Sequence, residues 1–215
     1  MIQRITYYVS IACLFLVIGG TSCHWDSPYI TVNLLIIYPD QMRGQAMGFL
    51  GLEYVKTPHL DKFATQSLVL NQAVSNYPLC SPTRASFMTG QYPQTHVVWS
   101  NCNSLSSPFN YELRANALCW SDVLSEKGYD TEYIGEWHLD NPQTPYINFK
   151  NNQGLVKWNE WTPSESRHGF HFWYASGIYD YHNRPMFWSN EAPRNSFHFV
   201  DQWGPEHETD LLSII

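Results

Sequence analysis

The residues with the clearest chemical potential lie in one run, Cys80–Gly90, which reads CSPTRASFMTG. Ser81-Pro82 is typical of a helix start, because serine caps helices and proline is tolerated in the first turn, and Gly90 is typical of a helix end. The free backbone N–H groups of that first turn would bind an anion and would stabilise a thiolate on the cysteine. Arg84 follows one turn later on the same face and offers a forked donor set to a tetrahedral oxyanion. The run therefore predicts a nucleophile, a helix dipole and an arginine around one anion.

The spacing within this run removes one alternative for Cys80 and leaves another open. A cysteine phosphatase loop needs a longer segment between its cysteine and its arginine to wrap a phosphate than the three residues that separate Cys80 from Arg84. The remaining alternative is a buried free cysteine beside a helix start, since free cysteine behaves as a small apolar residue.

The elements that would position this run alternate between strand and helix. Residues 31–38 (TVNLLIIY) are apolar and β-branched, as in a strand buried on both faces, and Asp40 and Gln41 follow where open α/β sheets bind ligands. The patterns further predict a helix from Thr57-Pro58, a strand over 67–73, a helix over 81–90, a helix over 121–127 and a strand over 131–135. This order predicts an α/β fold with a mostly parallel sheet flanked by helices.

The last third of the chain has a different character. Residues 141–205 are rich in Asn, Pro, Trp and Tyr and show little periodicity, which predicts a long, loop-rich insertion over the edge of the sheet. Residues 210–215 continue a helical pattern that has no cap at its end, so we expect the domain over 31–215 to be truncated at its C-terminus.

The N-terminus has the pattern of an export signal. Arg4 supplies a positive start, residues 5–18 are apolar and residues 19–22 are small, so residues 1–22 are predicted to be a signal peptide. The apolar stretch is short for a transmembrane helix. Cys23 follows directly and is a candidate lipid-accepting cysteine, with simple cleavage as the alternative. We therefore expect an exported protein, either periplasmic or anchored to the membrane as a lipoprotein.

Composition and cysteine count narrow the class of protein further. Hydrophobic residues make up 44% of the chain, enough to build a core, and the formal net charge is −7. An acidic chain argues against a nucleic-acid partner, which needs a basic face on the protein. Cys102 and Cys119 are candidates for one disulfide in an oxidising compartment, which would leave Cys80 unpaired.

The run CSPTR followed by ASFMTG resembles the C-x-P-x-R signature of the sulfatases. Two further segments resemble the same family in the same order: residues 33–41 (NLLIIYPDQ) resemble its first strand with the metal-binding end, and residues 135–139 (GEWHL) resemble its GKWHL segment. The resemblance is strongest over 31–140 and implies the N-terminal portion of an alkaline phosphatase-like fold. It also implies that Cys80 is oxidised to formylglycine by a formylglycine-generating or sulfatase-maturating enzyme.

The resemblance implies a role for each matching residue. Asp40 and the residue formed from Cys80 would ligate Ca²⁺, or Mg²⁺ in its place, and Gln41 would add an amide oxygen where many members have a second aspartate. The ion would polarise the sulfate oxygens and position the nucleophile. The hydrated aldehyde at position 80 would attack sulfur and then expel sulfate. Arg84 would hold this hydrate, and His138 would contact its hydroxyl and assist the expulsion of sulfate.

Two departures from the family pattern bear on activity. The lysine of the GKWHL segment is Glu136 here, and a carboxylate about 4 Å from a sulfate oxygen would cost on the order of several kcal/mol at an effective dielectric constant of about 20. Glu136 therefore either turns away from the substrate or impairs turnover. The family's second metal-ligand pair, its later substrate lysine and its Pro-His-x-Pro segment have no counterpart in this sequence.

Other histidines and the tryptophans are weaker candidates. His182 (in YDYHNRP) is a candidate substrate-binding residue, although a loop histidine packed against aromatic rings is the simpler interpretation. A zinc site among His168, His171, His182 and residues 206–208 (EHE) would lack the H-E-x-x-H and C-x-x-C spacings. Aromatic rings that could either stack on sugars or form part of a core are Trp158, Trp161, Trp173 and Trp188.

The leading hypothesis is the N-terminal portion of an exported, calcium-dependent sulfatase that hydrolyses sulfate esters, with sulfated polysaccharides as candidate substrates. One alternative is a catalytically inactive sulfatase fragment or remnant, which Glu136 favours. A second is a phosphate-ester or phosphonate hydrolase of the same superfamily, which would not need the signature at Cys80.

Overall fold

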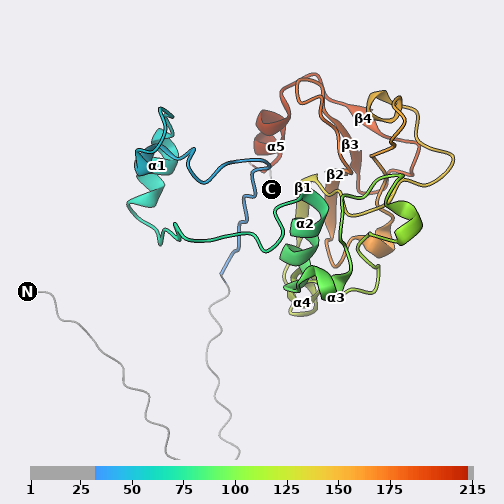
Figure 1. Ribbon diagram of the computed structural model, residues 1–215, viewed down its shortest axis with the longest axis horizontal. Coiled ribbons are helices and arrows are strands. Elements are labelled where there is room, and N and C mark those ends of the chain that lie inside the picture. The colour runs from blue at the N-terminus through green and yellow to red at the C-terminus, as the bar shows by residue number, and fades with distance from the viewer. Residues whose placement is uncertain (1–31, 213–215) are drawn as a thin grey trace, which may run out of the picture. The chain divides into compact units, whose positions relative to one another are not determined.

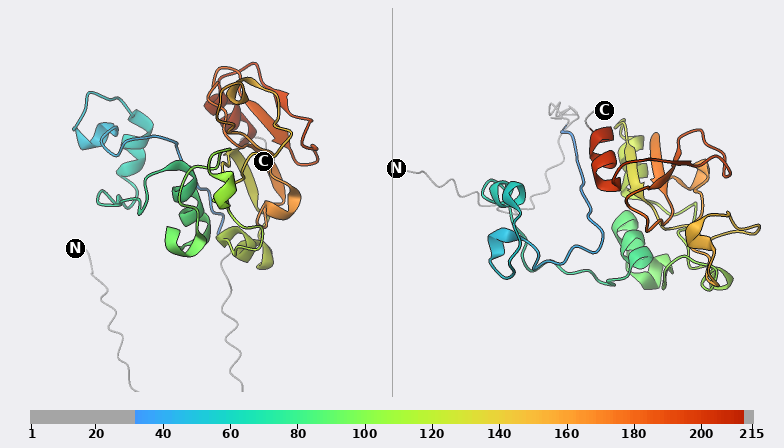
Figure 2. Two further views of the ribbon diagram at one scale, coloured as in Figure 1. Left: turned by 45° about the vertical axis from the view of Figure 1, so that its right-hand side comes forward. Right: turned by 90° about the horizontal axis from the view of Figure 1, so that it is seen from above.

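The computed structural model describes residues 32–212, and the chain divides into two compact units between Val69 and Leu70 (Figures 1 and 2). The predicted signal peptide, Arg4 and the candidate lipid-accepting Cys23 lie outside the described residues. No helix among the described residues has the length and apolar character needed to cross a bilayer.

The first unit holds a short 3-10 helix, η1 (Gly48–Leu50), and the helix α1 (Pro58–Ala64). α1 begins at the predicted Thr57-Pro58 step, but the Thr57 side chain does not cap it. Instead, the Thr57 hydroxyl accepts the Gly48 N–H at 2.8 Å and donates to Asp61 Oδ1 at 2.6 Å, and that carboxylate oxygen also accepts the Phe49 N–H at 2.9 Å. These bonds join the two helices of this unit.

The strands predicted over 31–38 and 67–73 are not formed: residues 32–39 and 68–70 have no regular secondary structure. The apolar side chains of both segments are exposed, with Ile37 at 76% and Leu68 at 84%. A strand needs a hydrogen-bonded neighbour, and its apolar faces are buried only when other elements cover them. Residues 32–69 contain two short helices and no partner strand, so apolar composition alone does not produce a strand there.

The helices of the second unit agree with the predicted boundaries near the signature. α2 (Cys80–Thr89) ends at Gly90, whose φ of 66° is the left-handed conformation that glycine adopts without strain. α4 (Trp120–Glu126) is the helix predicted over 121–127, displaced by one residue. The remaining helical segments are α3 (Pro93–His96), η2 (Ser107–Phe109), η3 (Lys150–Asn152), η4 (Ser164–Ser166) and α5 (Gly204–Leu212).

The sheet of the second unit has the order β1-β2-β3-β4, formed by β1 (Glu132–Glu136), β2 (Phe172–Ser176), β3 (Met186–Ser189) and β4 (His198–Phe199) (Figure 1). β1 and β2 run parallel, whereas β3 is antiparallel to both of its neighbours. The predicted α/β class is confirmed, with a sheet that is mixed. The predicted strand over 131–135 is β1, displaced by one residue.

One core joins α2 to the sheet. It contains Ala85 and Met88 from α2, Trp173 and Ala175 from β2, and Leu139, which follows β1. All are at most 3% exposed. The apolar face of α2 is therefore fixed against β1 and β2, and the start of α2 is held near the carboxyl end of β1.

The prediction of a loop-rich insertion over 141–205 is wrong in one respect, because these residues supply β2, β3 and β4. They also form a second core, in which Ile147, Phe149, Met186 and Trp188 are buried. Trp173 and Trp188 are each 1% exposed, so both are core residues and not sugar-stacking surfaces. The strands are two to five residues long, too short for a period of two to be visible in the sequence.

Candidate active site

Cys80 is the first residue of α2 and follows the N-cap residue Leu79. Its thiol is free and partly buried. The sequence position of Ser81 predicts that its side chain caps the helix, but no such cap is formed. Its hydroxyl, which is fully buried, donates to the His138 carbonyl at 2.7 Å and accepts the Cys102 N–H at 3.0 Å. The serine of the signature thus fastens the start of α2 to the segment that leaves β1.

Arg84 lies one turn further along α2, and its guanidinium binds Glu136 twice. Nη2 lies 3.1 Å from the carboxylate oxygen Oε2, and Nη1 donates to the backbone carbonyl of Glu136. The Tyr133 hydroxyl donates to the same carbonyl. The Arg84 side chain is only 10% exposed and that of Glu136 23% exposed, so this ion pair is largely shielded from water.

His138 completes the group at the end of β1. Its ring is buried, with Nε2 3.1 Å from the Cys102 carbonyl and Nδ1 3.3 Å from Glu136 Oε1. Its φ of 52° lies in the left-handed region, which a residue with a side chain adopts only when its surroundings enforce it. The Ser81 bond to the His138 carbonyl is one such restraint.

The charges of this group shift two pKa values in opposite directions. Burial lowers the pKa of His138, but interactions with Cys80 and Glu136 outweigh it, and the net pKa lies above the ordinary value. Burial raises the pKa of Glu136, whereas its contacts with His138 and Arg84 lower it below the ordinary value overall. Glu136 is thus held as a carboxylate between a guanidinium and an imidazole that binds a proton more readily than usual.

His182 and Glu208 are electrostatic neighbours of the same group. His182 lowers the pKa of both Glu136 and Glu208, while burial is the main cause that raises the pKa of Glu208. Glu208, on α5, lies over Gly135, where an added Cβ would come within 3.7–3.8 Å of its carboxyl atoms. Sequence reasoning missed Glu208 at this site: the EHE run was considered only as a metal-binding pattern.

The structure therefore brings Cys80, Arg84, Glu136 and His138 to one place, with His182 within electrostatic range. Asp40 and Gln41 belong to the first unit, where both are exposed and Gln41 has a left-handed backbone with φ of 54°. Glu136 turns toward Arg84 and His138. The carboxylate therefore does not turn away from the group proposed to bind sulfate, which was one of the two orientations expected from the sequence.

The predicted disulfide is wrong, because Cys102 and Cys119 are both free thiols. Cys102 Sγ donates to the Tyr111 carbonyl at 3.1 Å, and Cys119 forms the N-cap of α4. Burial raises the pKa of Cys119 to about 12 and that of Cys102 further, so neither thiol is ionised at neutral pH. Cys102 and Cys119 therefore have separate structural roles and do not form a disulfide with each other.

Among the described residues, one group of three side chains has the geometry to hold a metal ion: Cys119, Asp122 and His168. Cys119 and Asp122 already exchange hydrogen bonds as a capping box at the start of α4, with the Cys119 N–H 2.8 Å from Asp122 Oδ2. The group therefore has a structural role in the helix. The zinc pattern considered for the other histidines is not formed within the described chain.

Comparison with known proteins shows the family to which the chain belongs. The sequence pattern of the Sulfatase family matches residues 32–209. An Endo-4-O-sulfatase of Bacteroides thetaiotaomicron is 41% identical over 82% of this chain and 37% of its own length, and an Ulvan-active sulfatase of Formosa agariphila is 34% identical over 80% and 28%. The crystal structure of a candidate sulfatase, yidJ, from Bacteroides fragilis matches with a TM-score of 0.79 and 54% identity, over 80% of this chain and 37% of that one. The chain thus spans less than two fifths of the length of these relatives, and it belongs to the sulfatase family.

Proposed function

We propose that this chain carries the nucleophile and the anion-binding group of a sulfate ester hydrolase that acts on sulfated glycans. The observation that carries the proposal is the placement of Cys80 at the start of α2, one turn before a buried Arg84 and beside His138. Helix N–H groups and a guanidinium are the donors that a tetrahedral oxyanion prefers. The relatives whose names specify an endo-4-O-sulfatase and an ulvan-active sulfatase support a glycan substrate.

In the proposed reaction Cys80 is first converted to formylglycine by a maturating enzyme, and one hydroxyl of the hydrated aldehyde attacks the sulfur of the ester. The sulfur–oxygen bond to the glycan breaks, and the glycan leaves as its protonated hydroxyl. The second hydroxyl of the hydrate then loses its proton and restores the aldehyde, which expels sulfate, and water regenerates the hydrate. Arg84 holds the hydrate and the sulfate oxygens. His138, whose Nε2 is fixed by the Cys102 carbonyl, exchanges a proton with the hydrate through Nδ1. Its raised pKa suits this exchange near neutral pH. His182 is proposed to contact the substrate, because it is exposed and lies within electrostatic range of Glu136.

The family's calcium ion would increase the electrophilicity of sulfur when bound. Asp40 and Gln41 offer the hard oxygen donors that Ca²⁺ or Mg²⁺ prefers, but calcium takes six to eight such ligands. The one cluster of three metal-ligating side chains in the described chain lies at α4 and includes neither residue. These residues alone therefore do not complete a calcium site.

The Arg84–Glu136 ion pair favours a second candidate function, a non-catalytic sulfatase remnant. Glu136 Oε2 lies 3.1 Å from the guanidinium nitrogen that would otherwise bind a sulfate oxygen. Two unit negative charges about 4 Å apart repel by about 4 kcal/mol at an effective dielectric constant of about 20. A substrate sulfate must therefore displace the carboxylate or accept this cost.

Export remains part of the proposal, since the N-terminal pattern and a candidate lipid-accepting Cys23 indicate a periplasmic or lipid-anchored protein. Formylglycine is proposed to be formed by a separate enzyme before or during export.

The proposal is tested by co-expressing the full chain with a formylglycine-generating enzyme and measuring the sulfate released from a 4-O-sulfated chondroitin disaccharide. We expect release by the wild type, loss of release in Cys80→Ala, and unchanged release in Cys119→Ser, which keeps the N-cap of α4. Absence of release from the wild type, with release in Glu136→Lys, would favour the remnant.

A further inference from the structure

A cleft of about 600 Å³ opens in the second unit, away from the residues proposed for catalysis. Its lining comes from four segments: 97–99, 109–115, 140–143 and 161–166. Cys80, Arg84, Glu136, His138 and His182 are not among its lining residues. The volume falls within the range of small-molecule binding sites in proteins.

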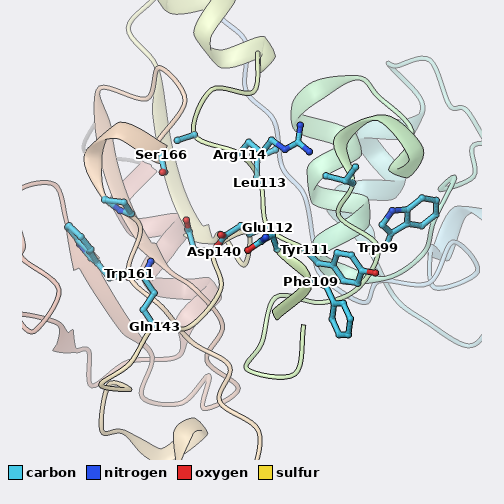
Figure 3. Close-up of a pocket in the computed structure, with 14 residues that line it drawn as sticks. Trp99, Phe109, Tyr111, Glu112, Leu113, Arg114, Asp140, Gln143, Trp161 and Ser166 are labelled. Atoms are coloured by element: carbon cyan, nitrogen blue, oxygen red, sulfur yellow. The ribbon is translucent and has the colours of Figure 1, made fainter. Parts of the chain in front are cut away.

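Exposed aromatic rings distinguish this cleft from an ordinary surface hollow. Trp99 is 37% exposed and Phe109 is 64% exposed, and Tyr111 stacks on Phe109 with ring centroids 5.5 Å apart. In the view of Figure 3 these rings lie on one side and Trp161 lies on the other. Trp161 is partly buried against the second core, whereas Trp99 and Phe109 present exposed aromatic surface, which is suited to the C–H face of a sugar ring.

Planar polar side chains lie between the aromatic rings. Asp140 and Glu112 occupy the middle of the cleft in Figure 3, and Gln143 lies beside Trp161. Asp140 Oδ2 accepts the Thr162 hydroxyl at 2.5 Å, and Glu112 Oε2 accepts the Asn141 N–H at 2.9 Å. These two carboxyl groups, each held by a hydrogen bond, and the exposed Gln143 amide offer acceptors and donors that suit the hydroxyl groups of a sugar.

The cleft is held in shape by bonds within the protein. The Trp161 indole N–H donates to the Ala192 carbonyl at 3.0 Å, and Leu113 N–H donates to the Leu139 carbonyl at 3.0 Å. Asn110, between Phe109 and Tyr111, has a left-handed backbone with φ of 54°. Since the binding groups are already in position, little ordering entropy would be lost when a ligand binds.

The charges of the cleft decide which sugar it would take. Asp140 and Glu112 are both acidic, and Arg114 at the rim is the one cationic side chain among the lining residues, which are all described. Burial raises the pKa of Asp140 to about 7, so this carboxyl group is only partly ionised near neutral pH. A sulfated ring would still meet the Glu112 carboxylate and this partly charged group against a single guanidinium, so an uncharged ring is preferred. We propose that this cleft is a binding site for an uncharged pyranose unit of a glycan, separate from the sulfate-binding group at Cys80.

The proposal takes its glycan from the proposed function, but it can fail or succeed independently. Asp140, which lines the cleft, follows His138 by two residues in the sequence. A glycan with sulfated and unsulfated units could therefore bind to the cleft and to the sulfate-binding group together. Binding to the cleft requires no formylglycine and no sulfate release. A negative binding result therefore contradicts the cleft alone, whereas an intact Cys80 thiol contradicts the catalytic proposal alone.

The test is a titration of the full chain with N,N′-diacetylchitobiose, an uncharged disaccharide, followed by calorimetry and tryptophan fluorescence. Excess sodium sulfate keeps the group at Arg84 occupied. We expect saturable binding that Trp99→Ala and Phe109→Ala each weaken about tenfold, as for the aromatic anchors of other binding sites. Trp99→Phe should restore most of the affinity. Both positions are exposed, so these variants are expected to fold.

Trp203→Ala is the matched control, because Trp203 is 55% exposed and does not line this cleft. Unchanged affinity in this variant supports the assignment. The proposal is overturned by an absence of saturable binding or by an equal loss of affinity in Trp203→Ala. It is also overturned if a chondroitin 4-sulfate disaccharide binds more tightly than the uncharged disaccharide in a manner that depends on Trp99.

Discussion

The Arg43–Glu53 ion pair of the first unit and the Arg84–Glu136 ion pair of the second unit differ in the way that matters for stability. Arg43 Nη2 lies 2.7 Å from Glu53 Oε2, and these side chains are 68% and 27% exposed. Arg84 Nη2 lies 3.1 Å from Glu136 Oε2, and these side chains are 10% and 23% exposed. The shorter pair is the more exposed one. We therefore expect burial and the number of additional partners, and not the distance between the charges, to decide how much each pair stabilises the fold.

The same contrast extends to the other side chains of the two units. In the first unit, apolar residues such as Leu35 and Ile37 are exposed, at 67% and 76%. In the second unit, polar residues such as Ser81 and His138 are buried, at 0% and 1%. A buried polar group is tolerated only with partners, and Ser81 has two. The second unit is thus held together around its polar site, whereas the apolar side chains at positions 34–37 are 40–76% exposed.

The largest effect is expected from removing the buried arginine. Arg84→Ala leaves the Glu136 carboxylate and carbonyl without their guanidinium and should lower the free energy of unfolding by about 3–5 kcal/mol, the range for breaking a buried pair. Arg43→Ala, at the exposed pair, should cost less than about 1 kcal/mol. Urea denaturation followed by circular dichroism measures both. Equal costs would show that the two regions do not differ in this respect.

The next effect compares apolar residues of the two units. Leu139 is fully buried in the core, so Leu139→Ala should destabilise by about 3 kcal/mol through lost burial and the cavity that remains. Ile37→Ala, at 76% exposure, should change the free energy of unfolding by less than about 0.5 kcal/mol. Thermal unfolding of the two variants provides the measurement. A loss of several kcal/mol in Ile37→Ala would show that residues 32–38 are buried in solution.

A third prediction concerns pH. Burial is the main cause that raises the pKa of Asp140 from 3.8 to about 7. Between these values the folded chain binds more protons at this position than the unfolded chain, so the contribution of Asp140 to stability is present below about pH 4 and is lost as the pH rises through about 7. Asp140→Asn should remove this loss and gain on the order of 2 kcal/mol relative to the wild type between pH 4 and pH 8.

The measurement is the unfolding free energy of both proteins across this pH range. Parallel pH profiles for the wild type and Asp140→Asn would show that the carboxyl group of Asp140 titrates as in water.

The smallest expected effect is on anion binding. Glu136→Gln removes the carboxylate that binds Arg84 and His138 while keeping the size of the side chain. The affinity for inorganic sulfate should rise about tenfold, because one repulsive charge beside Arg84 is removed. Glu53→Gln, at the exposed pair, should leave sulfate affinity unchanged. Isothermal titration with sodium sulfate makes the comparison, and an unchanged affinity in Glu136→Gln would place the sulfate elsewhere.

The sequence predicted those parts of the fold that depend on local chemistry. The C-terminal boundary of α2 follows from Gly90, because a cap residue acts on its immediate neighbours. Pro82 lies in the first turn of α2 as expected, although Ser81 does not cap the helix. The prediction of a strand over 31–38 is wrong for the described residues 32–38, because a strand depends on partner strands that its own residues do not specify. The approach of Glu208 to Gly135 could not be predicted either, because it brings together residues far apart in the chain.

The central claim is that the side chain at position 80 is a formylglycine nucleophile beside Arg84 and His138. The most direct test is mass spectrometry of the tryptic peptide that contains residue 80, from protein co-expressed with an active maturating enzyme. We expect a mass about 18 Da below that of the cysteine peptide, because the thiol group is replaced by an aldehyde. An intact thiol, which alkylates fully with iodoacetamide, would contradict the claim and leave the chain as a non-catalytic member of its family.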